Sequence, residues 1–196
     1  DEIHSDMALF GNKHIPFASV SPEAAACSIT FAAPSKTFNI AGIVCSYAVV
    51  PDDELRRKFY DWLDANEFGS APIFSYIATI AAFRNGEEWR RQMLEYVERN
   101  IEYVMSFCKE RIPQIRPLRP QASFLVWLDC RDLNLDHDSL ISLFKDKAGL
   151  ALNDGEMFNP GGKGFMRLNV GTTRAILHEA LMNLAKAIEC GCSVQP

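Results

Sequence analysis

The stretch FAAPSKTFNIAG, residues 31–42, decides the fold, because it sets a lysine between two apolar segments. Residues 28–33 and 43–50 are rich in apolar and β-branched side chains, which predicts two strands with Lys36 in the loop between them. Partial removal of such a lysine from water favours its neutral amine, the nucleophile that a Schiff base requires. A solvated loop lysine is the simpler interpretation, and this motif alone does not decide between the two.

Predicted strands and helices alternate through the rest of the chain. Further strands are expected at residues 123–129, SFLVWLD, and 165–171, FMRLNVG. Helices are expected at residues 52–66, 75–83, 87–112, 138–147 and 173–188, the second of them as a buried helix. This alternation favours an α/β fold over separate all-α or all-β domains.

The chain is predicted to divide around its long amphipathic helix. Residues 1–85 would form part of a larger domain, 86–111 the interdomain helix, 112–190 a small C-terminal α/β domain and 191–196 a tail. The proline-rich residues 114–123 read as an extended connection after the helix, and residues 152–164 as a loop.

Charge and composition narrow the choice of partners. Among 196 residues, 25 are acidic and 20 basic, so the net charge is −5, which argues against a nucleic-acid or anionic-membrane partner. The apolar stretches are shorter than the roughly 20 residues that a bilayer span needs, and the N-terminus lacks a signal pattern, so we expect a cytoplasmic protein without a membrane partner.

The cysteines do not predict a metal site. The six of them are scattered through apolar contexts without C-x-x-C spacing or nearby histidines, which favours buried free thiols over zinc ligands. Cys190 and Cys192 fall in a glycine-containing tail that we expect to fray.

The first residues, DEIH, carry a candidate acid and a candidate histidine. Ile3 alternates with polar neighbours, as at a strand end, where open α/β sheets place ligand-binding groups. The carboxylate of Asp1 suits a pyridine nitrogen, which it would keep protonated, and His4 lies three residues further on. The alternative interpretation is that Asp1 and Glu2 are ordinary polar residues at a strand end.

Arg167 lies in the middle of the apolar strand FMRLNVG. A guanidinium in that position must reach water or find an anion, and its planar fork suits a carboxylate such as that of an amino acid. A structural salt bridge is the competing interpretation.

Three motifs, DEIH, PSKTFNIAG and FMRLNVG, in this order and at this spacing, resemble the fold-type I pyridoxal-phosphate (PLP) enzymes. The nearest branch is that of the cystathionine β-lyase-like aminotransferases, or carbon–sulfur lyases. The resemblance continues through ANEFGSAPIFSYIATIAAFRNGEEW and covers essentially the whole chain. Since members of the family are about twice as long, the resemblance implies a PLP-dependent transferase-like fold of which this chain is the C-terminal half.

The resemblance also implies a role for each motif residue. Lys36 would form the internal aldimine with PLP, and Asp1 would pair with the pyridine nitrogen. His4 would lie near the phenolic oxygen of the ring, and Arg167 would bind the α-carboxylate of a small amino-acid substrate. Ser35 is a weaker candidate for a phosphate contact.

Two positions depart from the pattern of the family. Ala33 stands where relatives often have a phosphate-binding serine, and Val44 where aspartate-aminotransferase-like members have an arginine. The resemblance therefore implies that the phosphate site, like the aromatic residue that stacks on the ring, comes from an N-terminal half.

The resemblance leaves the reaction open between carbon–sulfur β-elimination and transamination, with the lyase favoured by His4 and Val44. Non-enzymatic alternatives are a catalytically inert fragment and an aminotransferase-like ligand-sensing domain. Relatives build their sites at a homodimer interface, and here Ser70 and Ala71 would reach toward the partner. Glu110, Arg116 and Arg119 could contact a substrate side chain but are more simply surface residues.

Overall fold

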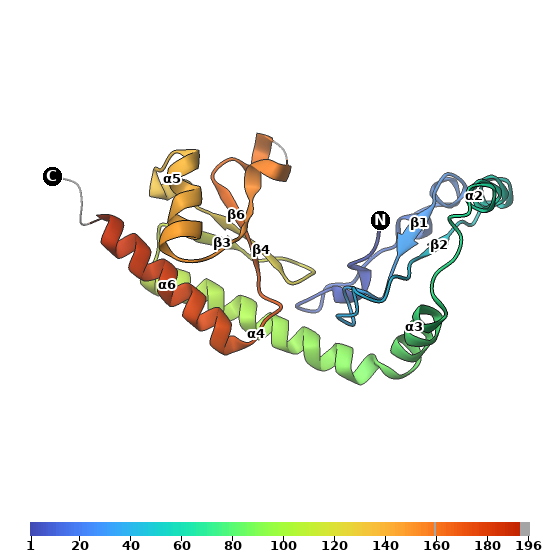
Figure 1. Cartoon of the computed structure of the whole chain (residues 1–196), viewed down its shortest axis with the longest axis horizontal. Helices are drawn as coiled ribbons and strands as arrows, with labels where there is room; N and C mark the ends of the chain where they lie inside the picture. The colour runs from blue at the N-terminus through green and yellow to red at the C-terminus, as the bar shows by residue number, and fades with distance from the viewer. Residues whose placement is uncertain (159, 193–196) are drawn as a thin grey trace. The chain divides into compact units, whose positions relative to one another are not determined.

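The computed structural model describes residues 1–158 and 160–192, with side chains to residue 190, and the chain forms two compact units, Asp1–Leu94 and Glu95–Pro196 (Figure 1). Most of the expected tail, 191–196, lies outside the described residues, although the last helix continues through Cys192. The division into 1–85, 86–111 and 112–190 stays a prediction.

Unit 1 contains a small sheet and three helices. Strands β1 (Thr30–Ala32) and β2 (Tyr47–Val49) pair antiparallel and are shorter than predicted. The helices are α1 (Pro22–Ala26), α2 (Asp53–Ala65) and α3 (Ile73–Asn85). Helix α2 begins where its acidic first turn predicted, because the Asp52 side chain accepts a hydrogen bond from the Leu55 N–H at 2.8 Å.

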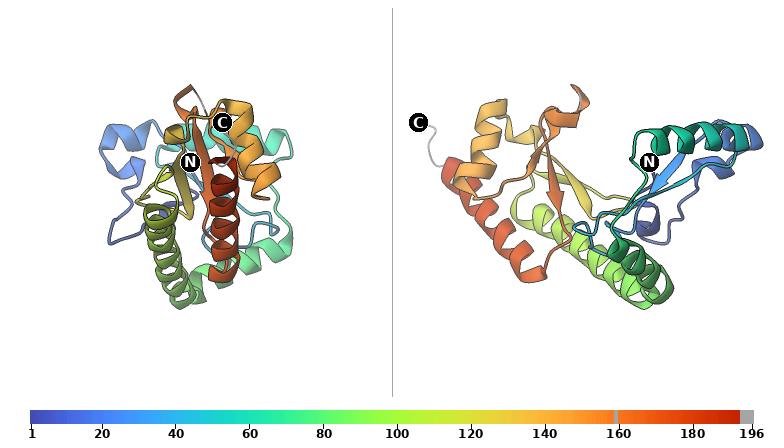
Figure 2. Two further views of the ribbon diagram at one scale, coloured as in Figure 1. Left: turned by 90° about the vertical axis from the view of Figure 1, so that its left-hand side faces the viewer. Right: turned by 45° about the vertical axis from the view of Figure 1, so that its right-hand side comes forward.

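Unit 2 is built on an antiparallel sheet of order β3-β4-β6-β5. The strands are β3 (Arg116–Leu118), β4 (Leu125–Asp129), β5 (Asn153–Asp154) and β6 (Phe165–Asn169), and the helices are α4 (Glu87–Arg111), which begins in unit 1, α5 (His137–Ser142) and α6 (Arg174–Cys192). Figure 2 shows α4 and α6 side by side on the sheet. Contacts join them near both ends of α6, at Arg174–Asn100 (2.9 Å) and Arg111–Glu189 (3.9 Å).

The core of unit 2 lies between helices α4 and α6 and the sheet. Helix α4 buries the apolar stripe that its sequence predicted, and α6 does the same. The fully buried members from the helices include Ile101, Val104, Leu177, Leu181 and Leu184, and those from the strands include Val126, Leu128 and Met166.

Three local structures differ from the sequence predictions. Strand β3 lies in the segment expected to be a connection, and it tolerates Pro117 because it is an edge strand. Strand β5 is only two residues long and lies in the expected loop. The helix predicted at residues 138–147 is α5 followed by a π-helical turn, Leu143–Lys147.

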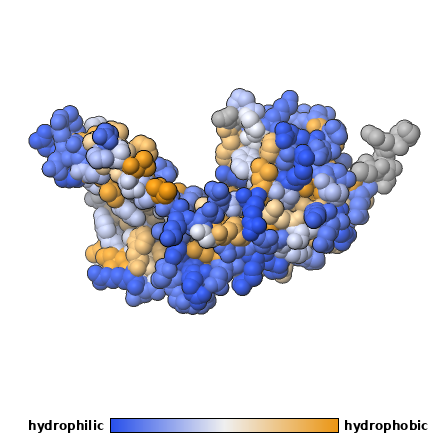
Figure 3. Space-filling view, turned by 180° about the vertical axis from the view of Figure 1, so that it is seen from behind, coloured by the Kyte–Doolittle hydropathy of each residue, from blue (hydrophilic) through white to orange (hydrophobic). Residues whose placement is uncertain are grey.

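The expectation that residues 75–83 form a buried helix is wrong for this chain. Helix α3 forms, but its large apolar side chains are solvent-exposed, among them Phe74 (78%), Ile77 (59%) and Ile80 (49%). Figure 3 shows apolar residues, in orange, on the surface of unit 1, to which α3 belongs. In the part of the chain that the structure describes, no helix is both long and apolar enough to cross a bilayer.

The prediction of buried thiols is right for two cysteines. Cys108 and Cys130 are buried, and burial raises the pKa of each thiol to about 12. Cys27 and Cys190 are exposed, Cys45 is half-buried, and the Cys192 side chain is outside the described residues. Among residues 1–158 and 160–192, no three His, Cys, Asp or Glu side chains gather as a metal site would need.

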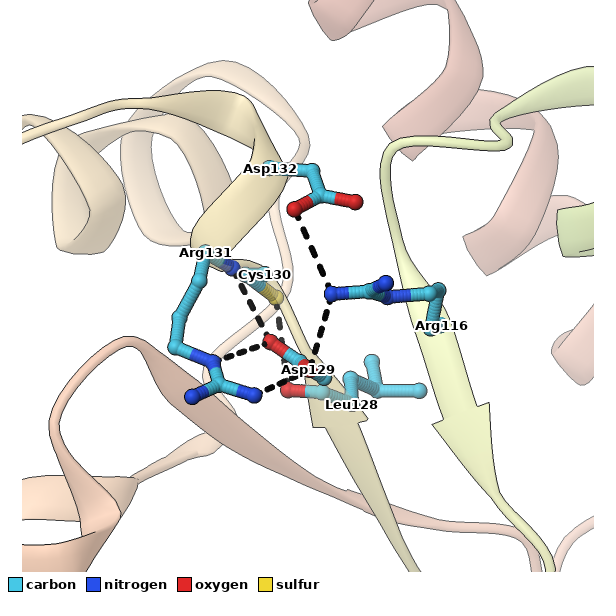
Figure 4. Close-up of polar contacts among 6 residues, drawn as sticks. All are labelled: Arg116, Leu128, Asp129, Cys130, Arg131 and Asp132. Atoms are coloured by element: carbon cyan, nitrogen blue, oxygen red, sulfur yellow. Dashed lines mark hydrogen bonds and ion pairs between the residues drawn. The ribbon is translucent and has the colours of Figure 1, made fainter.

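A buried carboxylate, that of Asp129, lies at the end of the central strand β4 and binds two arginines (Figure 4). Asp129 is only 5% exposed, and Arg131 donates to both of its oxygens, at 2.9 and 2.8 Å. Arg116 from β3 reaches the same carboxylate at 3.3 Å and Asp132 at 3.2 Å. The hydrogen bond from Arg131 is the main reason that the pKa of Asp129 falls from 3.8 to about 2.

This carboxylate makes stability depend on pH. Because the pKa of Asp129 is lower in the folded state, its contribution is complete above about pH 4 and is lost as the pH falls toward 2. We expect Asp129→Asn to lower the free energy of unfolding by about 1–2 kcal/mol near pH 6 and by almost nothing near pH 2. Urea unfolding across that pH range measures the difference.

The control variant is Asp132→Asn, whose side chain is 52% exposed and should change stability little. Equal losses in both variants at pH 6, or a loss in Asp129→Asn that persists at pH 2, would contradict the assignment.

Candidate active site

Lys36 lies in a tight turn that begins directly after β1. The Phe38 N–H donates to the Pro34 carbonyl at 2.9 Å, and the Ile40 N–H donates to the Ser35 carbonyl at 3.0 Å. These two bonds fix the backbone on both sides of Lys36, whose own side chain is exposed. The turn therefore holds an accessible amine at a defined place, whereas the expected partial desolvation is not found within this chain.

The neighbours of Lys36 in the turn are buried to different degrees. Ser35 is half-buried, while Thr37 is fully buried, and its Oγ1 has no hydrogen-bond partner. A buried hydroxyl without a partner costs free energy, so Thr37 Oγ1 has unused capacity for one hydrogen bond.

The first residues of the chain lie beside β1. The Glu2 N–H donates to the Phe31 carbonyl at 2.8 Å, which anchors this segment to the strand that leads to Lys36. Asp1 is exposed, and one of its oxygens accepts a hydrogen bond from the Ile3 N–H at 3.0 Å. Ile3 is in a turn rather than at a strand end, and a short 3-10 helix, Ser5–Met7, follows.

Glu2 has a structural role that the sequence interpretation missed. Its carboxylate accepts a hydrogen bond from the Phe17 N–H at 2.9 Å and pairs with His14 at 3.0 Å. The bond from Phe17 is the largest cause of a lowered pKa of Glu2. The only sequence signal was a charged residue beside Asp1, and the partners are more than ten residues away.

Four of the five predicted site residues belong to unit 1. Asp1, His4, Ser35 and Lys36 come from two segments that the Glu2–Phe31 hydrogen bond brings alongside each other, and His4 is half-buried. Arg167 belongs to unit 2.

Arg167 is held on β6 without a carboxylate partner among the described residues. Its Nη2 donates to the Asn153 side-chain oxygen at 2.9 Å, and its guanidinium lies 4.4 Å from the ring centroid of Phe158. Its Nε is buried and has no hydrogen-bond partner. Arg167 therefore keeps donor capacity for an anion, which argues against the structural salt bridge.

Two glycines hold the loop that precedes Arg167. A Cβ added to Gly155 would lie 2.2 Å from the Gly162 carbonyl oxygen, and one added to Gly162 would lie 1.9 Å from the Gly155 carbonyl oxygen. Only glycines permit this backbone contact, which closes the loop between β5 and β6. Asn153, the hydrogen-bond partner of Arg167, lies two residues before Gly155.

The residues of unit 1 fit the aldehyde and ring ends of PLP. Lys36 offers an accessible amine, Asp1 an exposed carboxylate, and Thr37 a buried hydroxyl without a partner. Phosphate donors are few at this turn, because Ala33 and Val44 have no polar side-chain atoms and the two hydroxyls are those of half-buried Ser35 and fully buried Thr37.

Comparison with known proteins shows extensive similarity to PLP enzymes. The cystathionine β-lyase PatB of Bacillus subtilis is 40% identical over 188 residues, which cover 96% of this chain and 49% of that protein. No family model matches the chain. The chain spans about half the length of the curated relatives it matches.

Solved structures agree in fold over nearly all of the chain. A PLP-bound aminotransferase-like protein of Clostridium difficile 630 superposes with a TM-score of 0.93 at 40% identity, covering 96% of this chain and 49% of that one. Cystalysin of Treponema denticola, which contains PLP, superposes with a TM-score of 0.93 at 30% identity, covering 97% and 48%. The predicted fold class, α/β of the PLP-dependent transferase type, is confirmed.

Proposed function

Because the chain belongs to the PLP-dependent aminotransferase superfamily, in its cystathionine β-lyase-like branch, we propose that it is the lysine-bearing C-terminal half of an amino-acid carbon–sulfur β-lyase. The observation that carries the proposal is the accessible amine of Lys36, fixed by the backbone hydrogen bonds of its turn in a chain 40% identical to a cystathionine β-lyase. Among the described residues, the turn that carries Lys36 offers few phosphate donors, so the proposal concerns the complete protein.

Each residue of the candidate site has a distinct task. The Lys36 amine would hold the cofactor and then act as the base that takes the proton from the substrate Cα. Asp1 would bind the ring N–H, and Arg167 would bind the substrate carboxylate through its free donors. Bound PLP supplies a ring that accepts the charge left at Cα. With a thiolate leaving group on Cβ, the carbon–sulfur bond would then break to give a thiol and aminoacrylate, and released aminoacrylate reacts with water to give pyruvate and ammonia.

Transamination is the second candidate, and it uses the same residues. It is favoured by the similarity to the aminotransferase-like protein of C. difficile, at the same 40% identity. The two reactions differ in where Lys36 returns the proton, and only products distinguish them. An inert or ligand-sensing role stays the alternative of another class.

The test is borohydride reduction of the complete protein in the presence of PLP, followed by intact mass and peptide mapping. A single pyridoxyl group on Lys36 supports the proposal, after which pyruvate release from cystathionine is compared with keto-acid formation. Absence of any adduct, with no reaction on either assay, would leave only the inert or ligand-sensing alternatives.

Arg167→Ala is expected to raise the KM for the amino-acid substrate by roughly 10- to 100-fold, because it removes about two charge-assisted hydrogen bonds. The value of kcat should change less, since Arg167 binds a group that is present in both the ground state and the transition state. Steady-state kinetics of the complete protein measure both constants.

The matched control for this prediction is Arg119→Ala, which removes an exposed arginine that pairs with Glu102. It should leave KM unchanged. If both variants have the same KM as the wild type, Arg167 does not bind the substrate.

We also propose that the active protein is a cytoplasmic homodimer. The apolar side chains that α3 exposes follow directly after Ser70 and Ala71, and a second copy is the partner that the resemblance implies for this segment. A dimer of the complete protein in sedimentation experiments supports this proposal, and a monomer at micromolar concentration contradicts it.

A further inference from the structure

The side chain of Phe38, two residues after Lys36, anchors the lysine turn to the corner between α3 and α4. Its ring makes edge contacts with Phe83 of α3, at a centroid distance of 5.7 Å, and packs near Trp89 of α4 at 6.1 Å. Two backbone hydrogen bonds around Lys36 close the turn itself. The Phe38 side chain connects this turn to both α3 and α4.

The corner is shaped to receive this ring. A Cβ added to Gly86, between the two helices, would lie 2.4 Å from Cε1 of Phe38 and 2.4 Å from the Ala82 carbonyl oxygen. The ring thus occupies the space that any other residue at this position would fill with its Cβ.

The same corner also holds the segment that carries Asp1 and His4. Arg90, on the first turn of α4, donates to the Asp6 carbonyl at 2.9 Å and is itself held by Glu87 at 2.7 Å. Just beyond Asp6, Met7 and Leu9 are fully buried. Two segments far apart in sequence therefore both contact the corner between α3 and α4.

We propose that Phe38 is a positioning residue, which acts through this corner to set Lys36 relative to the Asp1–His4 segment. The inference rests on the proposed function, because it matters only if Lys36 holds PLP and Asp1 binds the ring. Since a proton-transfer group displaced by about 1 Å can lose roughly 100-fold in rate, a loosened Phe38 should weaken catalysis without contact between Phe38 and the substrate.

The test compares three variants of the complete protein with added PLP. Phe38→Leu removes the ring from the corner, and Trp89→Leu removes the aromatic neighbour from the other side. Phe59→Leu is the matched control, because Phe59 is also half-buried and makes edge contact with Phe31 at 5.7 Å, but it lies on α2. Trp89→Leu keeps the test meaningful if Phe38→Leu does not fold.

Three quantities are measured for each variant: the fraction of Lys36 trapped by borohydride, the dissociation constant for PLP, and the pH midpoint of the visible band of lysine-bound PLP. We expect Phe38→Leu, and to a smaller degree Trp89→Leu, to weaken PLP binding about tenfold or more and to shift the pH midpoint. Phe59→Leu should lower the melting temperature similarly, with an unchanged midpoint.

If all three variants share the midpoint and PLP affinity of the wild type, the positioning role is wrong while the proposed function stands. If the wild-type protein forms no adduct on Lys36, both are wrong. A shifted midpoint in Phe38→Leu but not in Phe59→Leu supports the inference.

Discussion

Lys36→Ala is expected to remove all borohydride-stable cofactor from the protein and to lower kcat by about 1,000-fold or more. The effect is large because the Lys36 amine has two proposed roles, to hold the cofactor and to act as the general base. A general base alone accelerates a reaction by roughly 100- to 10,000-fold. The exposed position of Lys36 in its turn makes a structural effect on folding small. Mass spectrometry after reduction and steady-state kinetics measure the two losses.

The control for Lys36 is Lys58→Ala on α2, which removes an exposed lysine paired with Glu54. That variant should retain the adduct and the full rate. A pyridoxyl group found on a different lysine in Lys36→Ala would overturn the assignment, as would an unchanged visible band.

Asn100→Leu is expected to lower the free energy of unfolding by about 3 kcal/mol or more, the largest loss of stability among the changes considered. Asn100 is completely buried, and its amide donates to the carbonyls of Val170 and Thr172, each at 2.9 Å, while its oxygen accepts from Arg174 Nε at 2.9 Å. Leucine has a similar volume but leaves these partners unsatisfied. Urea denaturation measures the change.

The control for this prediction is Asn183→Leu, at a half-buried position on α6, which should cost less than about 1 kcal/mol. If both variants lose the same free energy of unfolding, the hydrogen bonds of Asn100 to Val170, Thr172 and Arg174 contribute little to stability.

Regular periodicity made the long elements predictable. The stripe on α4 and the apolar run of β4 are found close to their predicted bounds, because each buries one face against the core of its unit. Strand β3 was missed because Pro117 signals a break, and only the sheet topology shows that it occupies an edge. The burial of α3 was mispredicted because composition reports that a helix is apolar, not whether this chain supplies a partner for it.

The residues of the candidate site could be predicted from short motifs, but the contacts between distant residues that hold them could not. Lys36 and Arg167 were predicted from short motifs and a family resemblance, and the structure adds the surroundings of each. The anchors could not be predicted, because the Arg90–Asp6 contact joins residues 84 positions apart and the fit of Phe38 against Gly86 depends on a helix corner. Such contacts leave no periodic pattern in the sequence.

The unequal burial of the thiols divides them into two chemical classes. The thiolate is the form of cysteine that attacks an alkylating reagent, so Cys108 and Cys130, with pKa values raised to about 12, resist labelling in the folded state. Cys27 and Cys190 are exposed and lie in different units. Among the cysteines whose side chains are described, Cys27 and Cys190 thus provide exposed attachment points for a fluorophore in different units, and the two core thiols serve as internal reporters of unfolding.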